Sequence, residues 1–213
     1  MNIGVAYNPC SKCEEKSNCN ICELTYYRKG ALSMENKRTL AEIGIGESLK
    51  IAGIEFIKMR ERDGIAEIYA RKAAFNSSFG GNNNYSESRV KNRLEREILP
   101  LIEAEVGAEN IIEQEVDLRS LTGSSAYGLH KCKISIPTFD YIRENYKAIY
   151  DDAKKIDYRD WSWTATPNST TEFGEEDWVV CVSPVGYIHY FNGFYDFFGV
   201  RPFLLLKSSI FVS

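Results

Sequence analysis

Four cysteines near the start of the chain have the spacing of a metal site. The stretch PCSKCEEKSNCNIC gives the pattern C-x2-C-x5-C-x2-C, formed by Cys10, Cys13, Cys19 and Cys22. Each Cys-x-x-Cys pair can direct two thiolates at one ion, and four thiolates complete the closed tetrahedral shell that Zn²⁺ takes in structural sites. We therefore expect a structural Zn²⁺. Two disulfides or free thiols are the alternatives, and a reducing location disfavours the disulfides.

The other residues that could do chemistry are few and scattered. Cys181 lies inside the apolar stretch WVVCVS and Cys132 alternates with other residue types in KCKISI, so we interpret both as small buried hydrophobic residues. The chain has only two histidines, His130 and His189, and neither a G-x-S-x-G stretch nor a phosphate-binding glycine loop. The sequence makes no case for an enzyme, and we expect none.

The composition excludes several classes of partner. The 213 residues carry 26 basic and 30 acidic side chains, a net charge of -4, so we expect no nucleic-acid partner. No segment approaches the ~18 apolar residues of a membrane span, so we expect no membrane insertion. The first residues lack a basic segment followed by a long apolar run. We therefore expect a cytoplasmic protein, or one that is carried on a phage particle.

The distribution of cysteines, glycines and apolar residues divides the chain into three parts. Residues 1–30 hold the cysteine cluster and few apolar residues, which is typical of a zinc knuckle. Residues 31–45 suggest a connector helix, with a boundary at Gly44–Gly46. Residues 46–213 are long enough to bury one substantial core, so we expect the main domain there.

Strand patterns come in two groups. The first group contains two alternating segments and a returning strand behind the hairpin turn Asp63-Gly64; these are Ser48–Ala52, Ile54–Met59 and Ile65–Arg71. The second group contains short apolar segments in the last third of the chain, at residues 161–166, 178–183, 186–190 and 199–206. Because many short strands with frequent turns do not suit a doubly wound parallel sheet, we predict an α+β domain.

Two helices are expected between these groups of strands. The first begins at Ser86 as N-cap and ends or kinks at Pro100. Its apolar stripe, at helical spacing, is Val90, Leu94, Ile98 and Leu101. The second covers Phe139–Tyr150 and has Thr138 as its N-cap.

The stretch VGYIHYFNGFYDFFGVRPFLLL, residues 185–206, is dense in aromatic side chains. Aromatic rings give large contact areas at low entropic cost, so they are common in binding surfaces, but they also fill cores. We expect about half of the group in the core. The expected core positions are Ile188, Tyr190 or Phe198, Phe203, Leu204, Leu205 and Leu206. Arg201, next to Pro202, is expected to be a buried hydrogen-bonding residue.

The order of motifs in the last third resembles a known family. W-x-W-x-A-T-P (161–167), W-V-V-x-V-x-x-x-G-Y-I (178–188) and G-V-R-P-F-L-L-L (199–206) are similar to a bacterial and phage domain family that ends in Gly-Val-Arg-Pro. The ending also resembles the variable proteins of diversity-generating retroelements, in which the residues before Gly-Val-Arg-Pro are diversified. The resemblance covers residues 46–213, although the loop TPNSTTEFGEED is more acidic than its counterparts in those proteins.

The resemblance implies a C-type lectin-like fold, with two helices, small twisted antiparallel sheets and long loops, attached here to the N-terminal four-cysteine zinc knuckle. It implies a non-enzymatic recognition protein whose last strands and loops display a surface to a protein or glycan ligand. The positions that match the displayed ones are Tyr187, His189, Tyr190, Phe191, Asn192, Phe194, Tyr195 and Phe197, joined by Asn168, Ser169, Glu172 and Phe173. Gly199, Val200, Arg201 and Pro202 match the scaffold signature.

Two alternatives remain open at this point. The first is an enzyme of the formylglycine-generating type, which needs a redox-active cysteine pair or copper ligands, and only Cys132 and Cys181 are candidates. The second is a structural protein in which the zinc knuckle drives assembly. A homo-oligomer is compatible with each interpretation.

Overall fold

The computed structural model describes residues 38–150 and 161–212. The predicted zinc knuckle, residues 1–30 with all four of its cysteines, lies outside the described residues, as do residues 31–37 of the expected connector. The described residues form an α+β structure, as predicted. None of their helices is both long and apolar enough to cross a membrane.

The compact unit begins at Arg38, earlier than the boundary expected at residues 44–46. The described part of the expected connector helix is instead a strand, β1 (Arg38–Thr39), followed by a 3-10 turn, η1 (Leu40–Glu42). The buried Lys58 explains this, because its Nζ donates to the carbonyls of Leu40 and Ile43 at 2.9 and 2.7 Å and contacts the Glu61 carboxylate. A buried ammonium needs such partners, so it ties residues 40–43 to the sheet.

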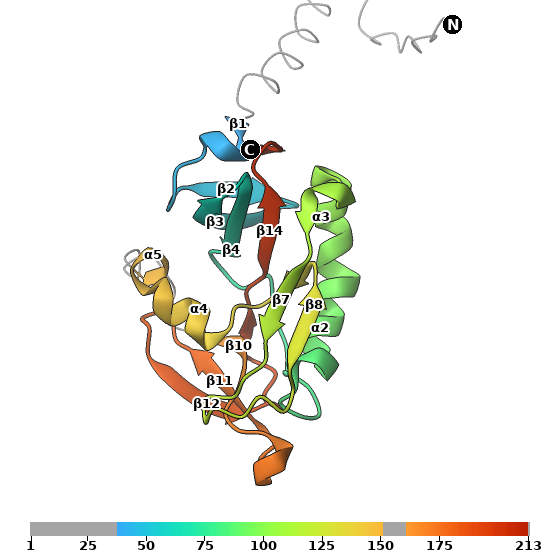
Figure 1. Cartoon of the computed structure of the whole chain (residues 1–213), viewed down its shortest axis with the longest axis vertical. Coiled ribbons are helices and arrows are strands. Elements are labelled where there is room, and N and C mark those ends of the chain that lie inside the picture. The colour runs from blue at the N-terminus through green and yellow to red at the C-terminus, as the bar shows by residue number, and fades with distance from the viewer. Residues whose placement is uncertain (1–37, 151–160, 213) are drawn as a thin grey trace, which may run out of the picture. The chain divides into compact units, whose positions relative to one another are not determined.

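The upper sheet in Figure 1 has six strands. Its order is β2-β3-β4-β14-β6, and β9 also pairs with β14. The predicted hairpin is confirmed: Asp63 and Gly64 have φ angles of 53° and 74°, as a tight two-residue turn requires. The strand bounds are β2 Ser48–Ile51, β3 Ile54–Arg62, β4 Ile65–Ala70, β6 Ile111–Ile112, β9 Ile134–Ser135 and β14 Phe203–Lys207.

The lower sheet has five strands in the order β12-β11-β10-β13-β5. The expected antiparallel pairing has one exception among the described strands, because β13 runs parallel to β10 and pairs at Ser162 with Gly199. The connection between these two strands, residues 168–198, contains β11 and β12 and is as long as parallel neighbours require. The strand bounds are β5 Phe75–Asn76, β10 Ser162–Pro167, β11 Trp178–Val182, β12 Ile188–Asn192 and β13 Gly199–Val200.

A long helical segment runs along the right-hand side of Figure 1. Ser88, rather than Ser86, caps it, and its Oγ accepts from the Lys91 amide. Pro100 does not end the helix, because it lies in the first turn of α3, where an N–H is not needed. The π turn η3 adds a residue, so Ile102 replaces Leu101 in the buried stripe. The bounds are η2 Tyr85–Glu87, α2 Arg89–Arg93, η3 Leu94–Ile98, α3 Leu99–Val106 and η4 Ala108–Asn110.

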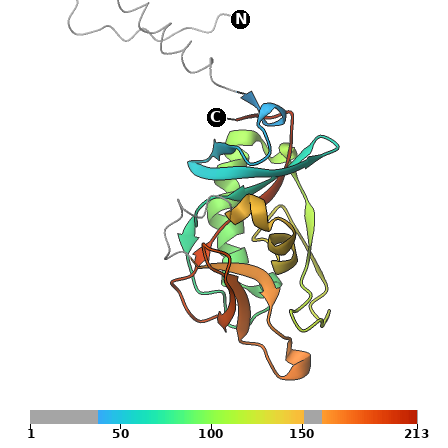
Figure 2. The same ribbon diagram turned by 90° about the vertical axis from the view of Figure 1, so that its left-hand side faces the viewer.

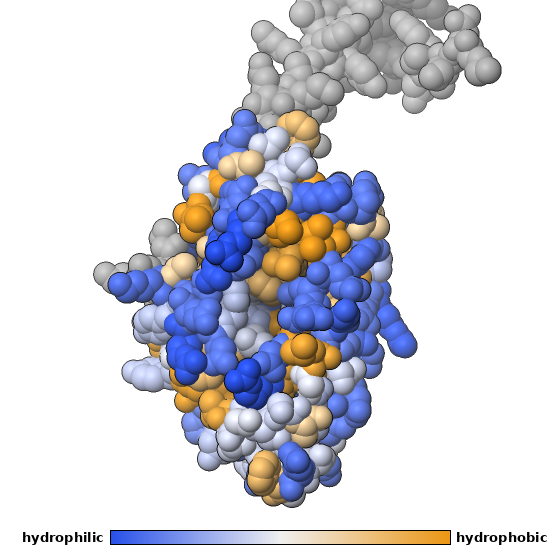
Figure 3. Space-filling model, viewed as in Figure 1, coloured by the Kyte–Doolittle hydropathy of each residue, from blue (hydrophilic) through white to orange (hydrophobic). Residues whose placement is uncertain are grey.

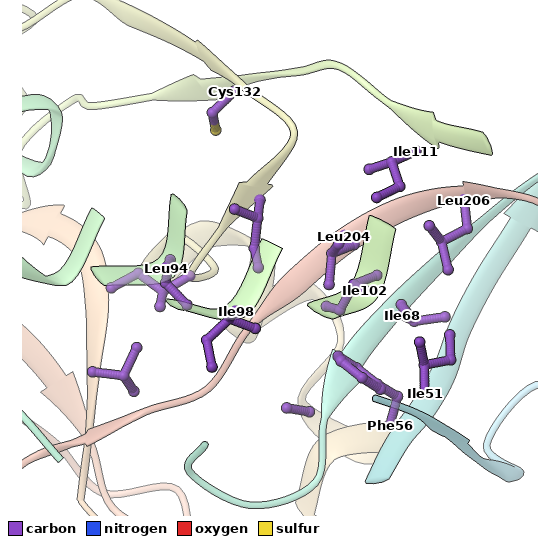
Figure 4. Packing of buried hydrophobic residues seen from close by; sticks show 14 of the residues in the cluster. Ile51, Phe56, Ile68, Leu94, Ile98, Ile102, Ile111, Cys132, Leu204 and Leu206 are labelled. Atoms are coloured by element: carbon purple, nitrogen blue, oxygen red, sulfur yellow. The ribbon is translucent and has the colours of Figure 1, made fainter. Parts of the chain in front are cut away.

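The main core lies between this helix and the upper sheet. Figure 4 shows Leu94, Ile98 and Ile102 of the helix facing the strands that carry Ile68 and Leu204. The second predicted helix is present, with Thr138 as its N-cap, but Asn145 divides it into α4 (Phe139–Glu144) and α5 (Tyr146–Tyr150). It packs on a smaller core between the sheets, which contains Ile57, Met59, Tyr69, Ile142, Ile149, Val182 and Phe203.

Two short ladders complete the fold. β7 (Gln114–Asp117) pairs with β8 (Leu129–Cys132), and Figure 2 shows this pair from the side. β1 pairs with β15 (Phe211–Val212), which joins the two ends of the compact unit.

Arg201 lies where the chain passes from the lower sheet to the upper one. It is 4% exposed, its Nε donates to the Ala70 carbonyl at 2.8 Å, and its guanidinium lies 4.1 Å from the Tyr69 ring centroid. The Ala70 amide in turn donates to the Pro202 carbonyl. The expectation that Arg201 is a buried hydrogen-bonding residue is confirmed.

We expect Arg201→Ala to lower the free energy of unfolding by about 2–4 kcal/mol, because it removes a charge-assisted hydrogen bond and a buried cation–π contact. Chemical denaturation at neutral pH measures this. The control Arg62→Ala removes an exposed arginine and should change stability by less than about 0.5 kcal/mol. Equal effects of the two substitutions would contradict the role given to Arg201.

Candidate binding surface

Strand β12 is an edge strand, and both of its faces reach solvent. In the register with β11, His189 lies opposite Cys181 and Phe191 lies opposite Val179, on the face that carries the main core. Ile188 and Tyr190 therefore lie on the other face, because side chains alternate along a strand. Helices α4 and α5 pack on that other face but leave β12 uncovered, since Ile188 and Tyr190 are 50% and 45% exposed.

On the core side, a group of rings runs without interruption from the interior to the surface. We call Trp161, His189, Phe191, Tyr195 and Phe197 the aromatic cluster. Its base is the buried Phe198, whose ring lies 4.2 Å from that of the core residue Trp163. Phe198 also contacts two members of the cluster, with ring centroids 4.7 Å from Phe197 and 5.1 Å from Phe191.

The outer members of the cluster are held by further ring contacts. The Phe191 ring lies 4.6 Å from that of His189, 5.9 Å from Trp161 and 6.3 Å from Tyr195. Tyr195 and Phe197 are 5.4 Å apart and remain 47% and 58% exposed. Because each ring rests on another, the exposed rings have little conformational freedom to lose on binding.

A second, smaller aromatic contact lies on the opposite face of β12. The rings of Trp178 and Tyr190 meet edge to face at 5.6 Å. Tyr187 and Phe194, at the two ends of the strand, are 71% and 63% exposed. The predicted display residues thus divide between two faces of one strand rather than forming a single surface.

The burial of the predicted positions differs from the expectation in several places. Phe198, Phe203, Leu204 and Leu206 are buried as expected, and Leu205 is half-buried. The expectation of a core position at Ile188 was wrong, and of the alternatives Tyr190 and Phe198 only Phe198 is buried, because the edge strand β12 lacks the neighbour that would cover Ile188 and Tyr190. Phe191 and Asn192 are half-buried. Trp161 and Trp178 were missed, although their place at the starts of β10 and β11 could have indicated them.

The loop at residues 168–173, which we expected to join the displayed residues, does not belong to the aromatic cluster. It packs against the 120–127 loop: Ser124 Oγ donates to Glu172 at 2.9 Å, and the Thr122 amide donates to the Asn168 carbonyl at 3.2 Å. Ser169 is buried and Asn168 half-buried, so neither presents a free side chain. Glu172 and Phe173, in η6 (Thr171–Phe173), are exposed, and Phe173 is the large apolar side chain among them, with 68% exposure.

The open edge of β12 is partly closed by its own histidine. Nδ1 of His189 lies 2.9 Å from the Tyr190 amide nitrogen and 2.7 Å from the Tyr190 carbonyl oxygen, and it bonds one or the other according to the tautomer of the ring. Such a cap blunts an edge that could otherwise pair with another chain. The strand therefore offers fewer free backbone groups for pairing with another strand.

A hollow of about 260 Å³ lies between β7 and α4. Figure 3 shows that this face is hollowed near its centre. One wall is Tyr141, whose hydroxyl donates to the Glu67 carboxylate at 2.8 Å. Burial and the nearby Glu67 raise the pKa of Tyr141, so its hydroxyl stays protonated and this hydrogen bond persists over the ordinary pH range.

The two described cysteines have the properties of structural residues. Both are buried and neither forms a disulfide. Burial raises the pKa of the Cys132 and Cys181 thiols to about 12, so neither is a thiolate at neutral pH. His130, two residues before Cys132 on the same face of β8, has its pKa lowered by burial and by Lys91, and its ring meets that of Tyr85 edge to face, with centroids 5.9 Å apart. These properties give no support to thiol chemistry of the formylglycine-generating type.

We expect iodoacetamide at pH 8 to leave Cys132 and Cys181 of the folded protein unmodified, because the reaction needs a thiolate. Peptide mapping by mass spectrometry distinguishes them from the N-terminal cysteines. The same treatment in guanidinium should modify both. Rapid modification of either in the native protein would mean that its thiol is accessible and ionised.

Among the described residues, no group of three or more His, Cys, Asp or Glu side chains is arranged to hold a metal. The predicted ligands Cys10, Cys13, Cys19 and Cys22 lie outside those residues. Comparison with protein-family models, with curated proteins and with solved structures found no match to this chain.

Proposed function

We propose that this protein is a non-enzymatic recognition protein that binds a protein or glycan ligand through the aromatic cluster. The observation that carries the proposal is the group of large aromatic side chains exposed between Tyr187 and Phe197. Exposed aromatic groups of this kind are a liability for a protein that binds nothing. Tyr, Trp and His rings combine an apolar face with a polar edge, which suits contact with sugars and with protein side chains.

The way the cluster is held supports the proposal. Its rings are packed on Phe198 and through it on the core, so a ligand would meet a preformed surface. The motif resemblance adds that all members of the cluster except Trp161 match displayed residues of a C-type lectin-like domain, of the kind encoded by phages and diversified by retroelements. We accordingly propose that fold and origin for the domain. A near-copy repeat of the coding sequence beside a reverse-transcriptase gene would identify it as a diversified protein.

Two surface tryptophans make binding directly observable. Trp161 belongs to the cluster and Trp178 to the opposite face, whereas Trp163 is fully buried. Ligands would be selected on a glycan array and from a displayed random-peptide library, and then titrated while tryptophan fluorescence is recorded. We expect a fluorescence change that Trp161→Phe abolishes and Trp178→Phe preserves, because the ligand covers the core-side face.

Substitution of the cluster gives the matching affinity test. We expect Tyr195→Ser/Phe197→Ser to weaken the selected ligand by about tenfold or more, since both side chains lie at the centre of the contact. The control Leu129→Ser/Phe211→Ser removes exposed apolar side chains elsewhere, which are 63% and 65% exposed. Full affinity in the cluster variant, or no ligand in either selection, would contradict the proposal. Dissociation of an oligomer by the cluster variant, seen by sedimentation, would make the cluster an assembly interface instead.

We also propose a structural Zn²⁺ held by Cys10, Cys13, Cys19 and Cys22. Paired Cys-x-x-Cys thiolates support this assignment. We expect elemental analysis of the purified chain to find about one Zn²⁺, and Cys10→Ser/Cys13→Ser to lose it, because two ligands cannot complete a tetrahedral shell. The double variant Cys132→Ser/Cys181→Ser should retain the metal. Intact disulfides without metal in the native protein would overturn the assignment.

A further inference from the structure

A hollow of about 380 Å³ opens beside the first turns of the long helix. One wall of the hollow is the Gly80-Gly81 segment, and the opposite wall is one face of α2 and η3. The helical residues that line it are Arg89, Asn92, Arg93 and Arg96, whose spacing places them on one face. Figure 1 shows α2 at the lower right of the molecule, and the right-hand edge of Figure 3 is largely hydrophilic.

Three arginines line the hollow, and the middle one, Arg93, is fixed in position and neutralised by an acidic partner. Arg93 forms a two-pronged contact with Glu97, with N···O distances of 2.9 and 2.8 Å. Its Nη1 donates to the Asn76 carbonyl at 3.1 Å, and its guanidinium lies 4.0 Å from the Phe75 ring centroid. Arg93 and Glu97 therefore form a rigid part of the lining without net charge.

Arg89 and Arg96 lie on either side of this pair and are exposed. Within residues 38–150 and 161–212, neither has an ion-pair partner. Glu87, the remaining acidic residue of the lining, accepts a hydrogen bond from the side-chain amide of Asn82 at 2.9 Å. Three arginines against two glutamates leave the hollow positive, although the whole chain is acidic with a net charge of -4.

The glycine wall keeps this positive hollow open. Gly80 packs tightly on the helix, since a Cβ there would lie 3.3 Å from the Arg89 amide nitrogen. A Cβ on Gly81 would meet no atom within 4 Å, so the space in front of Gly81 is free. Two unpaired guanidinium groups facing a wall without side chains are suited to an anion with several oxygens.

We propose that this arginine hollow binds a tetrahedral oxyanion, the phosphate or sulfate group of a ligand. Arg89 and Arg96 donate hydrogen bonds to its oxygens from two sides, while the Arg93–Glu97 pair holds the helix face in place. The site is distinct from the aromatic cluster, and the proposal does not rest on the proposed function.

The hollow nevertheless adjoins the loop that carries part of the aromatic cluster. The amides of Phe79 and Gly80 donate to the Gly193 carbonyl at 2.8 and 3.5 Å, and Tyr195 follows two residues later. A sugar that carries a phosphate or sulfate group has the chemistry to use both, with its anion in the hollow and its ring beside the loop.

The direct test is a titration of the full chain with inorganic phosphate and with inorganic sulfate, followed by amide and arginine Nε NMR signals at low salt. We expect saturable shifts centred on Gly80, Gly81, Arg89 and Arg96, which weaken as sodium chloride is added.

Arg89→Ala/Arg96→Ala should weaken binding by about tenfold or more, because two charge-assisted contacts are lost. Gly81→Leu, which fits without strain, should block the hollow. The charge-matched control Arg62→Ala/Lys131→Ala should change affinity by less than about twofold.

Each of the opposite results would overturn the proposal. These results are the absence of saturable binding of both ions, shifts centred elsewhere, or equal losses in the hollow and control variants. Glucose 6-phosphate and glucose 6-sulfate, compared with glucose, identify which ester the site prefers. If the inorganic ions bind and Tyr195→Ser/Phe197→Ser leaves their affinity unchanged, the anion site stands regardless of the outcome for the aromatic cluster.

Discussion

The guanidinium of Arg201 joins the two sheets, and the arrangement of the rest of the domain depends on it. The five residues from Gly199 to Phe203 leave the lower sheet as β13 and enter the upper sheet as β14. Arg201 lies in the middle of this passage, with Nε on the Ala70 carbonyl and the planar group against Tyr69. Burial of a cation is costly, and Nη2 of Arg201 has no hydrogen-bond partner among the described residues, so the Nε hydrogen bond and the ring contact are what offset that cost. The passage therefore has one well-defined path, and the two sheets have one relative position.

The same passage sets the position of the aromatic cluster. Phe198 immediately precedes β13 and is buried against Trp163, so its place follows from that of the strand. Phe197 and Phe191 rest on Phe198, and the outer rings rest on Phe191. The base of the exposed rings, Phe198, thus lies three residues before the buried arginine. Such a surface suits recognition because little order remains to be imposed on it when a ligand arrives.

The sequence predicted the parts of this architecture that local signals encode. The hairpin at Asp63-Gly64, the Thr138 N-cap and the burial of Arg201 all follow from short-range chemistry, and each is present. The exposure of Ile188 could not be predicted, because alternation along a strand does not tell which strand lies at an edge. The shift from Leu101 to Ile102 arises from one extra residue in a π turn, for which the sequence carries no distinct signal. The division of the predicted display residues between two faces of β12 could not be read from the sequence, because it depends on the register with β11.

The central claim is that the aromatic cluster is a rigid, preformed surface. Backbone order parameters from ¹⁵N relaxation of the free protein, measured for the amides of residues 188–198, test it most directly and require no ligand. A rigid cluster should give values of about 0.85 throughout this segment, as for ordered backbone. Values below about 0.6 for Phe191–Phe197 would contradict it, because rings on so mobile a segment could not form a preformed surface.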